Sequence, residues 1–331
     1  MKVLLYTGGR NLVGKSGVGS ALRHQEQALR LAGVDYTENP GEEYDVVHIN
    51  TVLPDSWWMA RRARRKGKKV IWHGHSTMED FRGSFIGSNT AAPLFKRWIR
   101  ECYGQADLVL TPTEYSRKLL ESYDMEKEIF PISNGVDTEF FRKEPGQRTR
   151  FRKVFGFRDD QPVILCVGLP IERKGILDVI RLAEELPWYQ FVWCGETPSG
   201  LLPGKIRQAI GQAPGNLHFA GYLDREALRD AYGGSDLFFF PSYEETEGIV
   251  VLEALSMEIP VLVRDIGVYQ GWLEDGIHVW KARDQEGFSS CIQGILDHTY
   301  PALTGAGRRI AEQRDLRNIG ECLARIYHKI L

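Results

Sequence analysis

Two glutamates and a glycine-containing turn, between residues 241 and 253, are the residues best placed to do chemistry. The segment reads Pro-Ser-Tyr-Glu-Glu-Thr-Glu-Gly-Ile-Val-Val-Leu-Glu and follows the apolar run 237–240. A turn that opens a helix directs its backbone N–H groups beyond the strand, which favours an anion such as a phosphate. Glu245 and Glu253 have seven residues between them, so they could hold opposite ends of one ligand. The alternative is a solvated acidic loop before an amphipathic helix.

A pair of cations follows another apolar run, at residues 163–167. The loop after this run contains Arg173 and Lys174, and a helical pattern begins at Ile176. Adjacent cations at the carboxyl end of a strand suit a diphosphate, because charge-assisted contacts stabilise a phosphate leaving group. An exposed Arg-Lys pair before a helix is the plainer alternative.

Two histidines follow the apolar run at residues 70–72. His73 and His75 are separated by Gly74. A free imidazole is mostly neutral at pH 7 and can both donate and accept hydrogen bonds, so either ring could contact a polar ligand. A purely structural histidine is the alternative.

A phosphate-binding pattern near the N-terminus supports a different function. Residues 9–16 read Gly-Arg-Asn-Leu-Val-Gly-Lys-Ser, which satisfies the P-loop pattern and indicates an ATP- or GTP-hydrolysing enzyme. Gly17 and Gly19 follow at once and weaken the helical turn that would hold the phosphates. The chain also lacks a clear apolar strand ending in an aspartate for magnesium. ATP hydrolysis dependent on Lys15 and magnesium would favour this alternative.

The elements that position these residues alternate along the chain, once before and once after about residue 138. We expect strands at residues 3–6, 46–49, 70–72, 108–110, 129–132, 163–167, 191–194, 217–219, 237–240 and 261–263. We expect helices at residues 21–32, 56–65, 177–186 and 225–232, and one long helix at 308–331. This alternation predicts an α/β fold with doubly wound parallel sheets, whose ligand sites lie at the carboxyl ends of the strands.

Composition narrows the class of protein. A length of 331 residues favours two domains, and a hydrophobic content of 43% with a net charge of −2 is typical of a globular protein that does not bind nucleic acid. The five cysteines are scattered, which indicates reduced thiols in a cytoplasmic protein and no zinc site. The first strand follows Met1 directly, leaving no room for a signal peptide, and no apolar run approaches the roughly 20 residues of a membrane span.

A basic segment with neighbouring aromatic residues indicates contact with a membrane surface. Residues 61–69 contain seven cations and no acid. Aromatic residues beside a basic helix are typical of segments that lie in the headgroup layer of an anionic bilayer. The residues expected to contact it are Trp57, Trp58, Arg61, Arg62, Arg64 and Arg65. A solvated helix face is the alternative, whereas RNA binding would need a motif that the chain lacks.

These motifs together resemble the retaining family-4 glycosyltransferases. The pattern Pro-Ser-x-x-Glu-x-x-Gly-x-x-x-x-Glu at 241–253 is similar to that family's signature, and Asn-Gly-Val-Asp at 134–137 is similar to its interdomain connection. The resemblance implies the GT-B fold, which has two facing Rossmann-like domains. It implies an acceptor- and membrane-facing domain at 1–138, a nucleotide-sugar-binding domain at 139–307, and a C-terminal helix at 308–331 that crosses back onto the first domain.

The resemblance also implies roles for single residues. His75 and Glu245 would act at the donor sugar, with His73 as the second choice of histidine. Glu253 would hold the ribose hydroxyls. The remaining donor contacts would come from Gly17, Val18, Arg173, Lys174, Gly248 and Ile249. The family usually carries an arginine where this chain has Leu169, so that one contact is not carried over.

A further resemblance concerns the acceptor. Residues 73–89, with the block at 244–253 and Val-Arg-Asp-Ile at 263–266, look like glycolipid synthases of Gram-positive bacteria. This implies transfer of glucose or galactose from a UDP-sugar donor to a glycolipid acceptor, monoglucosyldiacylglycerol, which builds the lipoteichoic acid anchor. Diacylglycerol itself, or another acceptor, is an alternative, and so is a silent UDP-binding module with the same fold.

The resemblance also leads to expectations about cofactors, the reaction mechanism and the location of the protein in the cell. We expect no metal or other cofactor, because two cations and a helix N-terminus can neutralise UDP, and the chain has no Asp-x-Asp motif. Same-face attack, assisted by the departing phosphate, is expected rather than double displacement. The protein is expected to be cytoplasmic and peripheral on the inner face of the cell membrane.

Overall fold

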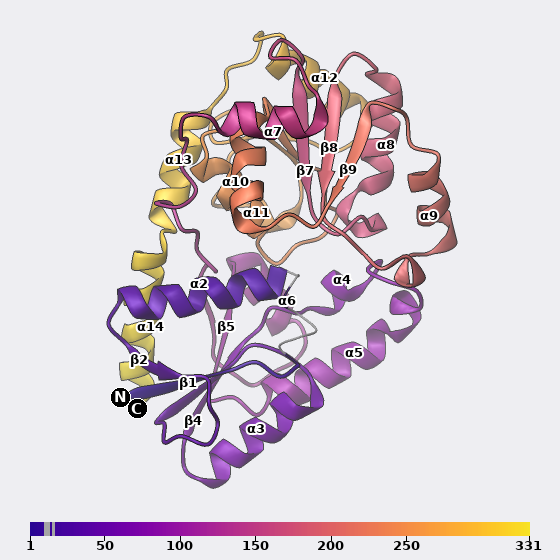
Figure 1. Cartoon of the computed structure of the whole chain (residues 1–331). Helices are drawn as coiled ribbons and strands as arrows, with labels where there is room; N and C mark the ends of the chain where they lie inside the picture. The colour runs from indigo at the N-terminus through magenta and orange to yellow at the C-terminus, as the bar shows by residue number, and fades with distance from the viewer. Residues whose placement is uncertain (10–13, 15–16) are drawn as a thin grey trace.

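The computed structural model of the chain describes residues 1–9, 14 and 17–331. Two parallel sheets of six strands each lie in separate halves of the molecule (Figure 1), which confirms the predicted α/β fold. The first sheet contains β1 (Lys2–Tyr6), β2 (Asp35–Thr37), β3 (Val46–Ile49), β4 (Lys69–His73), β5 (Leu108–Thr111) and β6 (Ile129–Pro131). The second contains β7 (Val163–Val167), β8 (Gln190–Cys194), β9 (Leu217–Gly221), β10 (Leu237–Phe240), β11 (Val261–Arg264) and β12 (Trp280–Ala282).

The strand orders place the site at the sheet centres. The first sheet has the order β2-β1-β3-β4-β5-β6 and the second β12-β11-β10-β7-β8-β9. In the second sheet β7 and β10 are neighbours, with Leu237 opposite Ile164, although more than 60 residues separate them. The loops that follow these two strands therefore leave the sheet side by side. This brings the cationic loop and the glutamate turn of the sequence into one region.

Helices cover both faces of each sheet. The first sheet is covered by α2 (Gly17–Leu31), α3 (Pro54–Arg65), α4 (Met78–Phe81), α5 (Ser88–Tyr103), α6 (Glu114–Glu121) and α14 (Leu316–Ile330). The second half contains α7 (Gln147–Phe155), α8 (Ile176–Glu185), α9 (Gly204–Gly211), α10 (Arg225–Gly234), α11 (Ile249–Ser256), α12 (Gln285–Leu296) and α13 (Thr304–Gln313). Two 3-10 turns, η1 (Glu172–Lys174) and η3 (Gly267–Tyr269), follow β7 and β11.

Alternation along β1 explains why the first sheet is buried on both faces. Val3 and Leu5 pack in one core cluster with residues of α2 and α14, whereas Leu4 packs in another cluster with residues of α3 and α5. Successive side chains of a strand point to opposite faces, so a continuous apolar run serves two layers of helices. This is the reason that the apolar runs of the sequence identified these strands.

The edge strands β2 and β12 were not predicted. Each is three residues long and has only one buried residue, Thr37 in β2 and Ala282 in β12. Neither has an apolar run, so the pattern used for the central strands does not reach them. The other ten strands occur where the sequence predicted them, with ends that differ by two residues or fewer.

The expected single helix at 308–331 is wrong, because the chain forms α13 and α14 with a break at Arg314 and Asp315. Both residues pair with the connection between the two halves. The amide of Val136 donates to the carbonyl of Arg314 at 3.0 Å, and the carboxylate of Asp315 accepts from the Thr138 hydroxyl. Asp315 also caps α14 by accepting from the amide of Arg317. The break thus ties the connection to the start of the last helix.

The last helix lies on the first half of the molecule. Helix α14 packs against α2 and crosses it (Figure 1), and Leu323, Ile326 and Tyr327 join the core beneath β1 and β3. Gly320 allows the close approach, since a Cβ there would lie 2.1 Å from the carbonyl oxygen of Ala28. The implied crossing of the C-terminal helix back onto the first half is therefore present. In the part of the chain that is described, no helix has both the length and the apolar composition that crossing a bilayer requires.

Candidate active site

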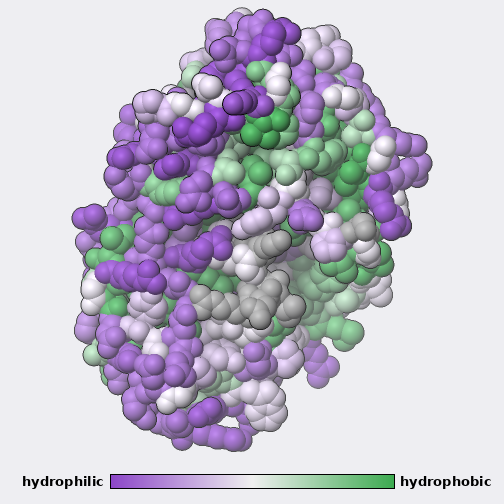
Figure 2. All heavy atoms as spheres, viewed as in Figure 1, coloured by the Kyte–Doolittle hydropathy of each residue, from purple (hydrophilic) through white to green (hydrophobic). Residues whose placement is uncertain are grey.

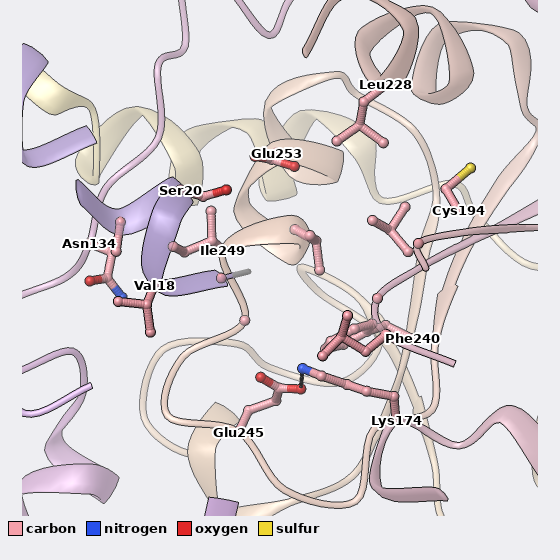
Figure 3. A pocket seen from close by; sticks show the side chains of 18 of the residues that line it. Val18, Ser20, Asn134, Lys174, Cys194, Leu228, Phe240, Glu245, Ile249 and Glu253 are labelled. Carbon is pink, nitrogen blue, oxygen red and sulfur yellow. Dashed lines mark hydrogen bonds and ion pairs between the residues drawn. The ribbon is translucent and has the colours of Figure 1, made fainter. Parts of the chain in front are cut away.

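A pocket of about 510 Å³ lies between the two halves, at the carboxyl ends of β4, β7 and β10. Figure 3 views it from close by, with the start of α2 on one side and the loops of the second sheet on the other. Its lining includes nine residues that the sequence singled out for the site, whereas His73, the second choice of histidine, is not among the described lining residues. The nine residues are Gly17, Val18, His75, Arg173, Lys174, Glu245, Gly248, Ile249 and Glu253. The fold thus brings all of them together, while their individual roles stay predictions.

Lys174 and Glu245 form an ion pair inside the pocket (Figure 3). Glu245 also accepts from the hydroxyl of Ser242 at 2.6 Å. Burial by itself would raise the pKa of Glu245, but the charges of Lys174 and Arg173 outweigh it and hold that pKa below its usual value. Burial also lowers the pKa of Lys174. Each partner stabilises the charge of the other against the effect of burial.

A glycine holds the cationic loop against the neighbouring strand. Gly175 has a φ of 80°, and a Cβ there would lie 2.7 Å from the carbonyl oxygen of Pro241. Only glycine has easy access to this conformation with so little space. Lys174 is therefore held at the end of β10, where its Nζ lies 5.2 Å from the centre of the Phe240 ring.

Arg173 joins the two halves of the molecule. Its guanidinium lies 2.8 Å from the carboxylate of Asp80 in α4, and its Nε donates to the hydroxyl of Ser84 at 3.2 Å. It also donates to the carbonyl of Glu244 at 2.8 Å. Burial raises the pKa of Asp80, although the charge of Arg173 opposes this. Sequence reasoning missed Asp80, because its partner lies 93 positions further along the chain.

The turn after β10 presents a helix N-terminus to the pocket. Gly248 has a φ of 88° and directly precedes α11, which has no side-chain cap at this end. The first amides of a helix have no partner within the helix, and together with its dipole they favour an anion. Ile249 and Glu253 both lie on this helix (Figure 3), so the same element offers amides and a carboxylate to the pocket.

Glu253 is a buried carboxylate with one hydroxyl partner. The hydroxyl of Tyr232 in α10 donates to its Oε2 at 2.9 Å. Burial raises the pKa of Glu253 to about 7, against the lowering effects of that hydrogen bond and of Arg225 and Arg23. The carboxyl group therefore changes its charge near neutral pH. Its ability to accept hydrogen bonds from a ligand depends on pH in this range.

His75, rather than His73, lies in the pocket. Its ring stacks on that of His73 with centroids 4.2 Å apart, and His73 in turn stacks on His48 at 5.4 Å. Burial lowers the pKa of His75 to about 4, so this ring is neutral at pH 7. The sequence-based preference for His75 agrees with this placement, since only His75 of the two belongs to the described lining.

Asn50, at the end of β3, orients the ring of His75. Its Oδ1 lies 3.1 Å from the Nε2 of His75, and its amide nitrogen donates to the Oε1 of Gln25 at 2.8 Å. Since the amide nitrogen is engaged with Gln25, the oxygen must accept, and His75 carries its proton on Nε2. The other ring nitrogen, Nδ1, is then an acceptor. Among the described residues, none bonds to that nitrogen.

Further lining residues escaped the sequence analysis. Asn134 was assigned only to the connection between the halves, yet it lines the pocket. Its amide nitrogen donates to the buried carboxylate of Glu247 at 2.8 Å, while its own oxygen is buried and has no partner in the described part of the chain. Leu223 and Leu228 add apolar side chains to the lining. No motif marks the two leucines, and the motif that contains Asn134 did not point to the pocket.

The N-terminal loop is described only in part. Gly17 and Val18 begin α2 and line the pocket, where Figure 3 places Val18 beside Asn134. The P-loop pattern at 9–16 includes residues 10–13 and 15–16, which lie outside the described residues. Leu169, at the position of the family's usual arginine, is part of the lining.

The basic helix α3 lies far from the pocket lining, at the opposite end of the first half (Figure 1). Trp58 is 60% exposed, whereas Trp57 is half-buried and donates to the carboxylate of Glu101 at 3.2 Å. Arg61 lies over the ring of Trp57 at 4.7 Å. The exposed cations of this helix are Arg61, Arg62, Arg64 and Arg65. Trp57 therefore has a packing role that the sequence did not indicate.

Two family models match the chain, one in each half. Residues 22–140 match the model described as Glycosyltransferase Family 4, and residues 147–300 match that of the Glycosyl transferases group 1. The chain is 40% identical over 332 residues to a processive diacylglycerol alpha-glucosyltransferase of Acholeplasma laidlawii, with 100% of this chain and 99% of the relative covered. It is 30% identical to an alpha-galactosylglucosyldiacylglycerol synthase of Streptococcus pneumoniae, with 82% of this chain and 75% of that protein covered.

Solved structures share the fold. A sucrose-phosphate synthase from Thermosynechococcus elongatus aligns with a TM-score of 0.82 at 17% identity, and 99% of each chain is covered. Anabaena HepE in complex with UDP and glucose aligns with a TM-score of 0.75 at 17% identity, again with 99% of each chain covered. At this identity the likeness concerns the fold alone.

Proposed function

The chain belongs to the glycosyltransferases of family 4 and group 1, and we propose that it transfers glucose or galactose from a UDP-hexose to a glycolipid acceptor in a membrane. One observation carries the proposal. Lys174, from the loop after β7, lines the same pocket as the Gly248–Ile249 helix start and Glu253, which belong to the turn and helix after β10. These are the groups needed to hold a diphosphate and a ribose together.

The donor would lie mainly against the loops at the carboxyl ends of the strands of the second sheet. Arg173, Lys174 and the amides of Gly248 and Ile249 would contact the diphosphate, and Glu253 would accept from the ribose hydroxyls. Glu245 would contact the sugar from its place beside Lys174, and Gly17 and Val18 would approach from the other half. Leu223 and Leu228 line the same pocket, and their apolar side chains would suit the flat face of a base.

The reaction would keep the anomeric configuration by attack on the same face. The acceptor oxygen bonds to the anomeric carbon, and the bond from that carbon to the diphosphate oxygen breaks with both electrons going to the phosphate. The proton of the acceptor hydroxyl passes to the departing phosphate. Two cations and a helix N-terminus stabilise the charge on UDP, so we propose that no metal is required. The neutral His75 would contact the sugar through its acceptor Nδ1.

The acceptor would be a glycolipid, monoglucosyldiacylglycerol, with diacylglycerol itself as the alternative. The A. laidlawii and S. pneumoniae relatives are named for such lipids. We place the protein on the inner face of the cell membrane as a peripheral protein, held in part by Trp58 and the cations of α3. Exposed cations beside an exposed indole suit an anionic headgroup layer.

A direct assay tests the proposal. The purified chain is incubated with UDP-glucose or UDP-galactose and with vesicles that contain diacylglycerol or monoglucosyldiacylglycerol, and the lipids are analysed by mass spectrometry. We expect one added hexose on the monoglucosyl lipid in the wild type, and none in Lys174→Ala or Glu253→Ala. Full activity of both variants would contradict the donor site. Product from diacylglycerol alone would favour the alternative acceptor.

A further inference from the structure

We propose that Asp80 binds the attacking hydroxyl of the acceptor. This inference rests on the proposed function, since it assumes a diphosphate at Arg173 and Lys174. It adds a residue that no motif singles out, and it places the acceptor end of the pocket at α4.

The first observation is where the carboxylates of the pocket come from. Glu196, Asp224, Glu245 and Glu253 all belong to the second half of the chain. Among the described lining residues, Asp80 in α4 is the only carboxylate that comes from the first half of the chain. The donor occupies the second half, so a group that receives the acceptor is expected to come from the first.

The second observation is the distance from Asp80 to the phosphate-binding cations. Its carboxylate lies 2.8 Å from the guanidinium of Arg173. In same-face transfer the attacking oxygen must lie beside the leaving phosphate oxygen, because the proton passes between them. A residue that holds the attacking hydroxyl must therefore lie next to the cation that holds the leaving phosphate. Asp80 meets this requirement.

Asp80 is also held in place and open to a ligand. The hydroxyl of Thr77 caps α4 by accepting from the amide of Asp80 at 3.1 Å, and the hydroxyl of Ser84 donates to its carbonyl at 2.9 Å. The side chain keeps 28% of its surface exposed. An ionised carboxylate offers several acceptor sites, and Arg173 does not use them all. The free positions can accept from a sugar or glycerol hydroxyl.

An apolar surface continues from Asp80 to the outside of the molecule. Phe81 stacks on Phe95 at 4.1 Å and touches Phe85 edge to face, and Phe85, Ile86 and Leu94 are 42%, 62% and 74% exposed. Figure 2 shows green apolar residues on the side of the molecule where Figure 1 places α4 and the start of α5. A hydroxyl binder next to exposed apolar side chains matches an acceptor that is polar at one end and acylated at the other.

The test separates transfer to lipid from transfer to water. For Asp80→Asn, kcat/KM for monoglucosyldiacylglycerol in vesicles is expected to fall roughly 10- to 100-fold, the effect of losing a hydrogen bond to a charged acceptor. Hydrolysis of UDP-glucose without lipid, and the Kd for UDP, should stay within about threefold of wild type, because neither needs the acceptor. Asp80→Glu should give an intermediate loss, since it keeps the charge but moves it.

Glu79→Gln is the matched control, because Glu79 is the neighbouring carboxylate of α4, accepts from the hydroxyl of Tyr123 and does not belong to the lining of the pocket. It should change none of these parameters by more than about threefold. If Asp80→Asn weakens UDP binding and hydrolysis as much as lipid transfer, Asp80 acts only through Arg173 and the inference is wrong. An Asp80→Asn enzyme with wild-type lipid kinetics would also overturn it. A wild-type protein that neither binds UDP nor hydrolyses UDP-glucose would instead refute the proposed function itself.

Discussion

The Nε2 of His75 lies 3.1 Å from the Oδ1 of Asn50, and this contact determines which ring nitrogen carries the proton. The chain of contacts continues through Gln25 to His48, whose Nδ1 lies 2.6 Å from the hydroxyl of Tyr327 in the last helix. The orientation of a pocket histidine is thus linked to the C-terminal end of the described chain.

Asn50→Asp should move the acid limb of the activity profile to higher pH. A carboxylate next to His75 stabilises the imidazolium and raises its pKa from about 4. A protonated ring has no acceptor nitrogen, so we expect activity to fall about tenfold or more between pH 8 and pH 6 in the variant, but not in the wild type. The measurement is kcat/KM for the donor against pH. Asn318→Asp, on the exposed face of α14, should keep the wild-type profile.

The buried histidines should make the fold sensitive to acid. Burial lowers the pKa of His24 and His75 to about 4 and that of His48 to about 3. Below pH 6.5 the unfolded chain therefore binds more protons than the folded one, and the free energy of unfolding falls by about 1.4 kcal/mol per pH unit for each such histidine. The loss should begin near pH 6.5, and it should level off near pH 4 for His24 and His75 and near pH 3 for His48. Urea unfolding across this range measures it.

His48→Gln provides the comparison for acid sensitivity. It removes one of the titrating groups, so the slope of stability against pH should become smaller. His328→Gln changes an exposed histidine and should leave the slope unaltered. Equal slopes in all three proteins would show that the buried rings are not responsible.

UDP binding should strengthen as the pH rises from 6 to 8. Burial raises the pKa of Glu253 to about 7, and only the ionised carboxylate can accept from both ribose hydroxyls. Tyr232→Phe removes a hydrogen bond that stabilises the ionised form, so the midpoint should move to higher pH. Calorimetric titration with UDP at several pH values gives the midpoint. Glu253→Gln controls for the titration of UDP itself and should lack the component near pH 7.

Variants of the ion pair between Lys174 and Glu245 should affect the stability of the fold and the transferase activity differently. Lys174→Met leaves a buried carboxylate with one cation fewer, and we expect a loss of about 1–3 kcal/mol in the free energy of unfolding. The double variant Lys174→Met/Glu245→Gln removes both charges and should recover most of that loss. Neither variant should transfer hexose, because the cation at the diphosphate is absent from both. Recovery of activity in the double variant would contradict the donor role of Lys174.

Vesicle binding should depend on the cations of α3. A quadruple variant changes four arginines of this helix to Gln: Arg61, Arg62, Arg64 and Arg65. Each change should remove about 1 kcal/mol of the free energy of binding to an anionic membrane surface. Co-sedimentation with vesicles that contain anionic lipid should drop strongly, while UDP binding is unchanged. The control changes four exposed cations of the other half, Lys143, Lys153, Lys205 and Arg207, and should bind vesicles as wild type does. Equal binding by both quadruple variants would remove α3 from the membrane contact.

The sequence predicted the central strands because these are buried on both faces. A run such as Val163–Val167 has to be apolar throughout, and that leaves a clear signal. Edge strands such as Asp35–Thr37 lack this constraint and were missed. The prediction of one long helix at 308–331 was wrong for a different reason. The break at Asp315 arises from pairing with Val136 and Thr138, which are distant in sequence.

The site was predictable where one segment carries several of its residues. Glu245, Gly248 and Glu253 belong to one strand–turn–helix unit, so their spacing was informative. Asp80, Asn50 and Asn134 reach the site through contacts between segments that only the folded chain brings together. A single sequence gives no sign of such pairs, because each partner by itself is an ordinary polar residue.

The position of α14 has a consequence for how the molecule assembles. Synthesis proceeds from the N-terminus, so β1 and β3 emerge from the ribosome long before Leu323, Ile326 and Tyr327, which complete their core. Until then, one face of α2 and the apolar layer beneath these strands remain uncovered. The core of the half that is translated first is therefore completed only by the last helix, and a chain that stopped before residue 316 would leave that layer uncovered.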